Sequence, residues 1–204
     1  MEPRRGLRIG WTILMVSALY VGAVTAWIAS GDRRVITVME LLTIWAALVL
    51  VQFMAEVHLG ARDQERSRSL VALVLTAGMA VVTITNHFLY LTVLPRIFLG
   101  AELPSWLLLD GWPSITKGLE CVAWALFLGL AMLFASGVSS SLGKGAMAWT
   151  LRISGVLTLA GLAGPVTGNM DLYLLSTIGY SVGLLVLSVE LIAAFRGVRR
   201  PVAS

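Results

Sequence analysis

Long apolar runs separated by short polar links constrain this chain more than any other feature. An α-helix needs about 20 mostly apolar residues to cross a bilayer core. Six runs meet this requirement: 9–30, 35–57, 69–94, 117–138, 146–168 and 172–196. With 58% hydrophobic and only 13% charged residues, the chain exposes more apolar surface than one soluble core can bury. The pattern predicts an all-α fold, a polytopic transmembrane bundle of six helices that forms a single domain over residues 1–204.

The distribution of lysine and arginine predicts the orientation. Eleven of the 15 basic residues fall on the side that would hold both termini, and four on the other side. Because cytoplasmic loops carry the excess of basic residues, we expect a multi-pass protein of the inner (plasma) membrane with both termini in the cytoplasm. The net charge of +4 is spread in short clusters between apolar runs, so it indicates topology and no nucleic-acid partner.

The segment 95–116 is the one long link. It reads PRIFLGAELPSWLLLDGWPSIT, and its prolines argue against a seventh span. Trp106 and Trp112 favour the membrane interface, so the segment is expected to lie on the outer surface between the third and fourth helices. It is interpreted either as an anchoring loop or as a lid.

Small residues at helical spacing predict close helix packing, within the chain or in a homodimer. They form three ridges: Ala18, Gly22 and Ala26; Ala160, Gly164 and Gly168; Gly179 and Gly183. Pro165 is expected to kink the fifth helix.

Ionisable residues within the apolar runs are the candidates for function, because each costs roughly 2.5–3.5 kcal/mol at the centre of a spanning helix. From a rise of about 1.5 Å per residue, Glu40 lies about 7 Å and His87 about 10 Å below the outer end. Glu120 lies closer to that end. Four neighbours are expected to complete a substrate-binding pocket: Thr83, Asn86, Tyr90 and Trp124.

Two interpretations of this outer group stay open. In the structural one, His87 bonds Glu40 to join two helices and Glu120 pairs with Lys117. In the catalytic one, Glu40, His87 and Glu120 act as acid and base on a lipophilic small molecule from the membrane lipid. Aromatic faces would stabilise a developing carbocation, as in membrane-embedded isomerases and cyclases of sterols and isoprenoids.

The alternative function is a small transporter, channel or accessory subunit of a membrane complex. Such a path needs polar residues near mid-membrane, and the sixth helix offers Ser176, Tyr180 and Ser181 for it.

A second polar group lies toward the opposite surface. Arg152 and Glu190 are at similar depths, which predicts a structural ion pair between the last two helices. His58 and His87 lie near opposite faces of a core about 30 Å thick and Cys121 is the single cysteine, so no metal site and no cofactor are expected.

Several stretches resemble a group of small bacterial six-helix integral membrane proteins. They are TVMELLTIW (37–45), NHFLYLTV (86–93), GWPSITKGLECVAWALFLGLAMLFA (111–135), ISGVLTLAGLAGPVTGNM (153–170) and IGYSVGLLVLSVELI (178–192). The resemblance implies the six-helix topology and transfers no catalytic residues.

Overall fold

The computed structural model describes residues 3–32, 34–98 and 112–196, and within these ranges the chain is helical, with no strands. Six helical segments are long and apolar enough to cross a membrane, which confirms the predicted number of spans. They are Arg4–Ser30, Arg34–Leu59, Asp63–Val93, Ile115–Ser141, Gly145–Thr167 and Met170–Arg196.

Eleven helical elements make up these spans, and some spans contain more than one. In order they are α1 (Pro3–Ser30), α2 (Arg34–Leu59), η1 (Asp63–Glu65), α3 (Arg66–Phe98), α4 (Ile115–Glu120), the π-helix η3 (Cys121–Phe127), α5 (Leu128–Ser141), α6 (Gly145–Ala160), α7 (Ala163–Thr167), η4 (Met170–Tyr173) and α8 (Leu174–Arg196).

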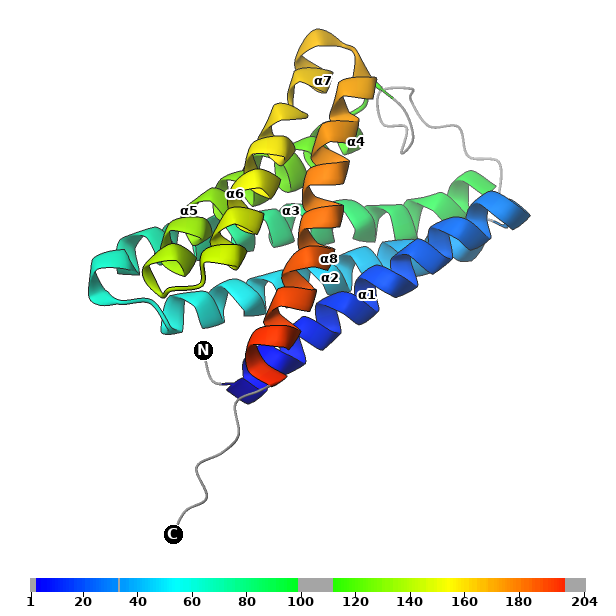
Figure 1. Ribbon diagram of the computed structural model, residues 1–204. Coiled ribbons are helices and arrows are strands. Elements are labelled where there is room, and N and C mark those ends of the chain that lie inside the picture. The colour runs from blue at the N-terminus through cyan, green and yellow to red at the C-terminus, as the bar shows by residue number, and fades with distance from the viewer. Residues whose placement is uncertain (1–2, 33, 99–111, 197–204) are drawn as a thin grey trace.

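The beginning of α1 and the end of α8 lie at the same end of the bundle (Figure 1). We name this end the terminal end and the opposite one the far end. The guanidinium of Arg196 lies 5.1 Å from the ring centroid of Trp11, and Arg5 forms a 3.0 Å ion pair with Glu56 at the end of α2. These contacts bring α1, α2 and α8 together at the terminal end.

The helices α1 and α8 cross near the terminal end and diverge toward the far end (Figure 1). At the crossing, a Cβ added to Gly10 would lie 3.0 Å from Cγ1 of Ile192. Farther along α1, Gly22 has nothing within 4 Å of the same position. The close approach of the two helices at Gly10 is therefore not repeated at Gly22.

Small residues bring α6 and α8 into close contact, as the Gly179–Gly183 ridge predicts. A Cβ at Gly183 would lie 2.0 Å from Oγ of Ser154, and one at Gly179 would lie 2.7 Å from the backbone nitrogen of Thr158. In the second ridge, Gly164 lies against Tyr173, while Gly168 ends α7 with a φ of 78°. The first ridge is exposed along α1, and a homodimer contact there stays a prediction.

The fifth span is interrupted where Pro165 predicts a kink. Its α6 part ends at Ala160 and α7 begins at Ala163. A proline ring clashes with the carbonyl of the residue four positions earlier, here Gly161, so the break lies where the ring requires it.

Most of the predicted interfacial segment 95–116 lies outside the described residues, which leave out 99–111. Its two described ends are helical, because α3 continues to Phe98 and α4 begins at Ile115. The hydroxyl of Ser114 accepts a hydrogen bond from the backbone N–H of Lys117 and so caps the start of α4.

Candidate functional site

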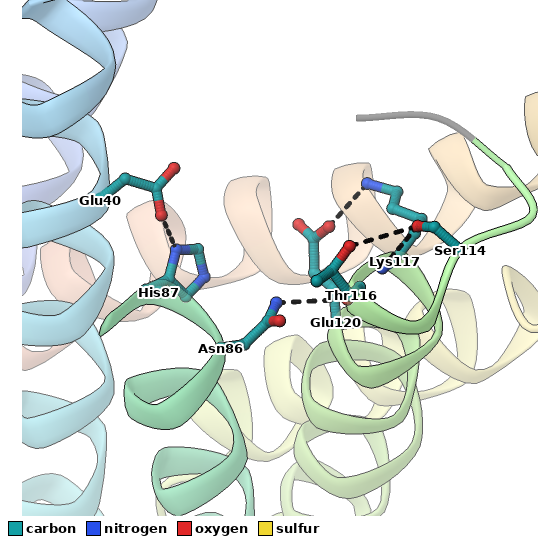
Figure 2. Close-up of polar contacts among 7 residues, drawn as sticks. All are labelled: Glu40, Asn86, His87, Ser114, Thr116, Lys117 and Glu120. Atoms are coloured by element: carbon teal, nitrogen blue, oxygen red, sulfur yellow. Dashed lines mark hydrogen bonds and ion pairs between the residues drawn. The ribbon is translucent and has the colours of Figure 1, made fainter. Parts of the chain in front are cut away.

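Glu40 and His87 face each other across the α2–α3 contact in the far half of the bundle (Figure 2). His87 Nδ1 is hydrogen-bonded to Glu40 Oε2, and both side chains are buried. The turn through η1 makes α2 and α3 antiparallel neighbours, so residues near the end of α3 lie beside residues near the start of α2. The two residues that were predicted to share one depth are therefore in direct contact.

The second ring nitrogen of His87 has no partner within the described protein. Nε2 is buried, and it faces away from Glu40 toward the helix that carries Glu120 (Figure 2). His87 as a whole is only 8% exposed. Since buried polar atoms are almost always hydrogen-bonded, this nitrogen is suited to a ligand or a water molecule.

The polar neighbours of His87 on α3 have separate positions. Asn86 donates from Nδ2 to the backbone oxygen of Thr116 at 3.2 Å and so links α3 to α4, while its Oδ1 has no partner among the described residues. Thr83 is buried and donates to the sulfur of Met79. The Tyr90 ring stacks beside His87 at 6.2 Å. All three were predicted to bind substrate, but they surround His87 without lining the cavity described next.

A cavity of about 180 Å³ lies between α1, α2, α3, the α4–η3 segment and α8. Three of the predicted site residues line it: His87, Glu120 and Trp124. Glu40 is not among the lining residues, but it is bonded to His87, which is. The remaining walls are Val16, Ser17, Tyr20, Val21, Leu42, Thr43, Ala46, Thr177, Tyr180, Ser181, Leu184 and Leu185.

Glu120 is held by a neighbour on its own helix. Its Oε2 accepts a 2.7 Å hydrogen bond from Lys117 Nζ, and the same ammonium lies 5.2 Å from the ring centroid of Tyr173. The expected Lys117–Glu120 contact is thus present. About 29% of the Glu120 side chain remains exposed, so this contact leaves the carboxylate accessible.

Trp124 lies in the middle of the π-helix η3 and forms part of the cavity wall. The wider turn is visible in the hydrogen bond from the N–H of Leu128 to the carbonyl of Ala123, five residues earlier. Trp124 is 6% exposed, and its ring centroid is 5.2 Å from that of Tyr180. Such π-helical turns frequently mark functional sites.

Sequence reasoning missed the hydroxyl groups that α1, α2 and α8 bring to the cavity. They belong to Ser17, Tyr20, Thr43, Thr177, Tyr180 and Ser181. Of these, Tyr180 and Ser181 were predicted only as part of a transport path. A hydroxyl group costs little free energy in a spanning helix, so a Ser, Thr or Tyr in an apolar run does not by itself indicate a functional residue. Only the crossing of α1 and α8 brings these groups together.

The predicted ion pair between Arg152 and Glu190 is not formed. Glu190 accepts a 3.0 Å hydrogen bond from the hydroxyl of Thr150, and the guanidinium of Arg152 lies 5.3 Å from the ring centroid of Trp149. Residues two apart on an α-helix point about 200° apart. Since Thr150 faces Glu190, Arg152 must face elsewhere.

The terminal end has polar contacts of its own, separate from the cavity. Besides the Arg5–Glu56 ion pair, His58 Nδ1 lies 2.8 Å from Oγ of Ser69. These contacts join α1 to α2 and α2 to α3, so they hold helix ends together.

No protein-family model matches the chain, and no curated protein or solved structure is significantly similar to it. Function is therefore argued from the geometry of the cavity.

Proposed function

We propose that the protein binds a lipophilic small molecule in this cavity and converts it by acid–base chemistry at His87. The observation that carries the proposal is the difference between the surroundings of the two ring nitrogens of His87. Nδ1 is bonded to a buried carboxylate, while Nε2 is turned toward the other cavity wall and has no partner in the described protein. A histidine that only joins two helices does not need its second ring nitrogen to face a cavity.

Glu40 selects the form of His87 that can act as a base. An ionised carboxylate only accepts hydrogen bonds, so the neutral imidazole carries its proton on Nδ1 and its lone pair on Nε2. When Nε2 takes a proton from a substrate, the imidazolium that forms is stabilised by the adjacent negative charge of Glu40. Glu40 is a positioning residue in this scheme, and His87 is the catalytic residue.

Glu120 and the aromatic rings supply the rest of the reaction. Glu120 lines the same cavity as His87 and can relay a proton from the ammonium of Lys117 to another part of the substrate. One proton added and one removed moves a double bond or closes a ring with no net change in composition. The faces of Trp124 and Tyr180 stabilise the cation formed between the two steps. The proposed reaction class is therefore isomerisation or cyclisation of an isoprenoid- or sterol-like molecule.

The divergence of α1 and α8 supports access from the lipid. Tyr20 and Val21 on α1 and Ser181 on α8 line the cavity and are exposed on the side of the bundle. A lipophilic substrate would pass between these helices without leaving the bilayer.

We further propose that the terminal end faces the cytoplasm, that the protein resides in the inner (plasma) membrane, and that the cavity belongs to the outer half of the bilayer. The support is the excess of basic residues on the terminal side. The segment 95–116 would then lie on the outer surface.

A transporter, channel or accessory subunit is the alternative. Transport needs polar groups that continue from the cavity toward the terminal end. The walls next to the cavity in that direction are Ile13, Val49 and Leu50, and this change to apolar side chains supports binding and conversion over passage.

Deuterium exchange tests the proposal with a mixture of lipids in place of one chosen substrate. Purified protein is incubated in D2O with a total lipid extract, and the lipids are analysed by mass spectrometry. Proton removal and return at carbon should incorporate deuterium into one lipid class. His87→Gln keeps a donor toward Glu40 but has no base, and we expect a loss of about 100-fold or more.

Glu65→Gln provides the matched control, because Glu65 is an ion-paired carboxylate at the terminal end. This variant should exchange deuterium at the wild-type rate. Equal deuterium incorporation by folded wild-type and His87→Gln proteins, or none in the wild type with any extract fraction, would refute acid–base conversion.

A further inference from the structure

A second, smaller cavity continues the first toward the terminal end. It measures about 20 Å³ and lies between α1, α2 and α8. Val16, Ser17, Ala46 and Leu184 line both cavities. The two spaces therefore adjoin along one wall, and together they run from the level of His87 toward the middle of the bundle.

The chemical character of the walls changes along this path. The larger cavity carries a carboxylate, an imidazole and hydroxyl groups, whereas the smaller one has a single polar wall residue, Ser17. The other walls of the smaller cavity are apolar: Ile13, Val16, Ala46, Val49, Leu50 and Leu184. Polar groups thus occupy one end of the path and hydrocarbon walls the other.

The space available also changes along the path. A space of about one water-sized probe is near 10–15 Å³, so a cavity of about 20 Å³ has room for little more than one methylene group. Ile13, Val49 and Leu50 are buried on their own helices, and well-packed interiors resist enlargement. This part has no room for a fused ring system, whereas the end of a single hydrocarbon chain that begins in the larger cavity fits it.

We infer that the substrate is a single-chain amphiphile, with its polar end beside His87 and Glu120 and its chain extending between α1, α2 and α8 toward the terminal end. This inference rests on the proposed function and narrows it to a linear isoprenoid or other open chain, to the exclusion of a fused-ring sterol. The reacting carbons are those near the polar end, because the acid–base groups lie only there.

Photo-crosslinking tests the orientation. Two hexadecanol probes are used, one with a diazirine at carbon 3 and one at carbon 15, on purified protein in detergent. The carbon-3 probe should label peptides containing His87 or Trp124, and the carbon-15 probe should label peptides containing Ile13 or Val49. Unlabelled hexadecanol should compete with both, and cholesterol should compete at least 10-fold less well.

Substitutions in the smaller cavity provide an independent measurement. Val49→Phe, or the milder Val49→Leu, should reduce carbon-15 labelling about 5-fold or more and leave the labelling by an octanol probe unchanged, because Val49 lines only the smaller cavity. Leu48→Phe is the control, because Leu48 is 52% exposed on the outside of the same helix. It should label as the wild type does.

The outcomes separate this inference from the proposed function. Effective competition by cholesterol, or carbon-15 labelling at the His87 end, overturns the single-chain inference while deuterium exchange can still support acid–base conversion. Absence of saturable labelling by every probe overturns both.

Discussion

At the scale of single residues, burial limits what Glu40 and His87 can do. A carboxylate and an imidazole in an apolar bundle need each other, because either one alone would leave a buried polar group without a partner. Their contact uses one ring nitrogen of His87, and the other has no partner in the part of the chain that the structure describes. The same pair thus serves stability through Nδ1 and, in the proposed mechanism, chemistry through Nε2.

Substitution of Glu40 should separate these two roles. Glu40→Ala leaves the Nδ1–H of His87 without an acceptor, and we expect a loss of about 1–3 kcal/mol in the free energy of unfolding. Glu40→Gln keeps an acceptor oxygen and should lose less stability, yet it removes the negative charge that stabilises the imidazolium. The measurements are melting temperature in detergent and deuterium exchange.

A different pattern would contradict this assignment. If Glu40→Gln lost as much stability as Glu40→Ala but exchanged deuterium normally, the pair would join α2 to α3 and have no part in the reaction.

At the scale of secondary-structure elements, the contact of α6 with α8 depends on paired small residues. Gly183 lies against the Ser154 side chain, and Gly161 lies against the side chain and backbone nitrogen of Ser176. In lipid no hydrophobic force drives one apolar helix onto another, so close van der Waals packing of small residues takes that role. This contact places Tyr180 and Ser181 of α8 at the cavity.

Gly183→Ala tests the α6–α8 packing. The added methyl would overlap Oγ of Ser154 at 2.0 Å, and we expect a loss of about 1–3 kcal/mol in the free energy of unfolding. Because the overlap is with a side chain, Ser154→Gly in the same protein should restore most of the melting temperature.

Gly22→Ala is the matched control in a spanning helix, since nothing lies within 4 Å of the added methyl. Alanine is a better helix former than glycine, so stability should stay equal or rise. A large loss of stability at Gly22 would point to a partner on the exposed α1 ridge, and an unaffected Gly183→Ala variant would contradict the packing described.

At the scale of the whole molecule, α1 and α8 cross near the terminal end and diverge toward the far end (Figure 1), and the cavity lies between them. The proposed orientation places this cavity in the outer half of the membrane. This orientation can be tested without an activity assay.

Cysteine accessibility tests the orientation. Single cysteines are introduced at Ser30 near the far end and at Gln64 near the terminal end, in a Cys121→Ser background, since both positions are exposed. In intact cells a membrane-impermeant maleimide should label Ser30→Cys alone. Gln64→Cys should react only after permeabilisation, and the reverse result would place the terminal end outside the cytoplasm.

The sequence alone determined the number and placement of the spans. Apolar length is a local property, and a helix is the one open-ended structure that satisfies its own backbone in lipid. For the same reason the candidates Glu40, His87 and Glu120 were identifiable, because ionisable groups are costly in lipid and therefore rare there. Depth along the helix then predicted that Glu40 and His87 share a level.

Only the tertiary structure decided which side chains meet. Helices that are apolar all round do not show in their sequence which face turns inward, so rotation about the axis could not be predicted. In the structure Glu190 faces Thr150 and Arg152 faces elsewhere, so the predicted Arg152–Glu190 ion pair does not form. The helices α1 and α8 approach closely at Gly10 and diverge toward the far end (Figure 1). The cavity between them brings its hydroxyl groups to the same space as His87.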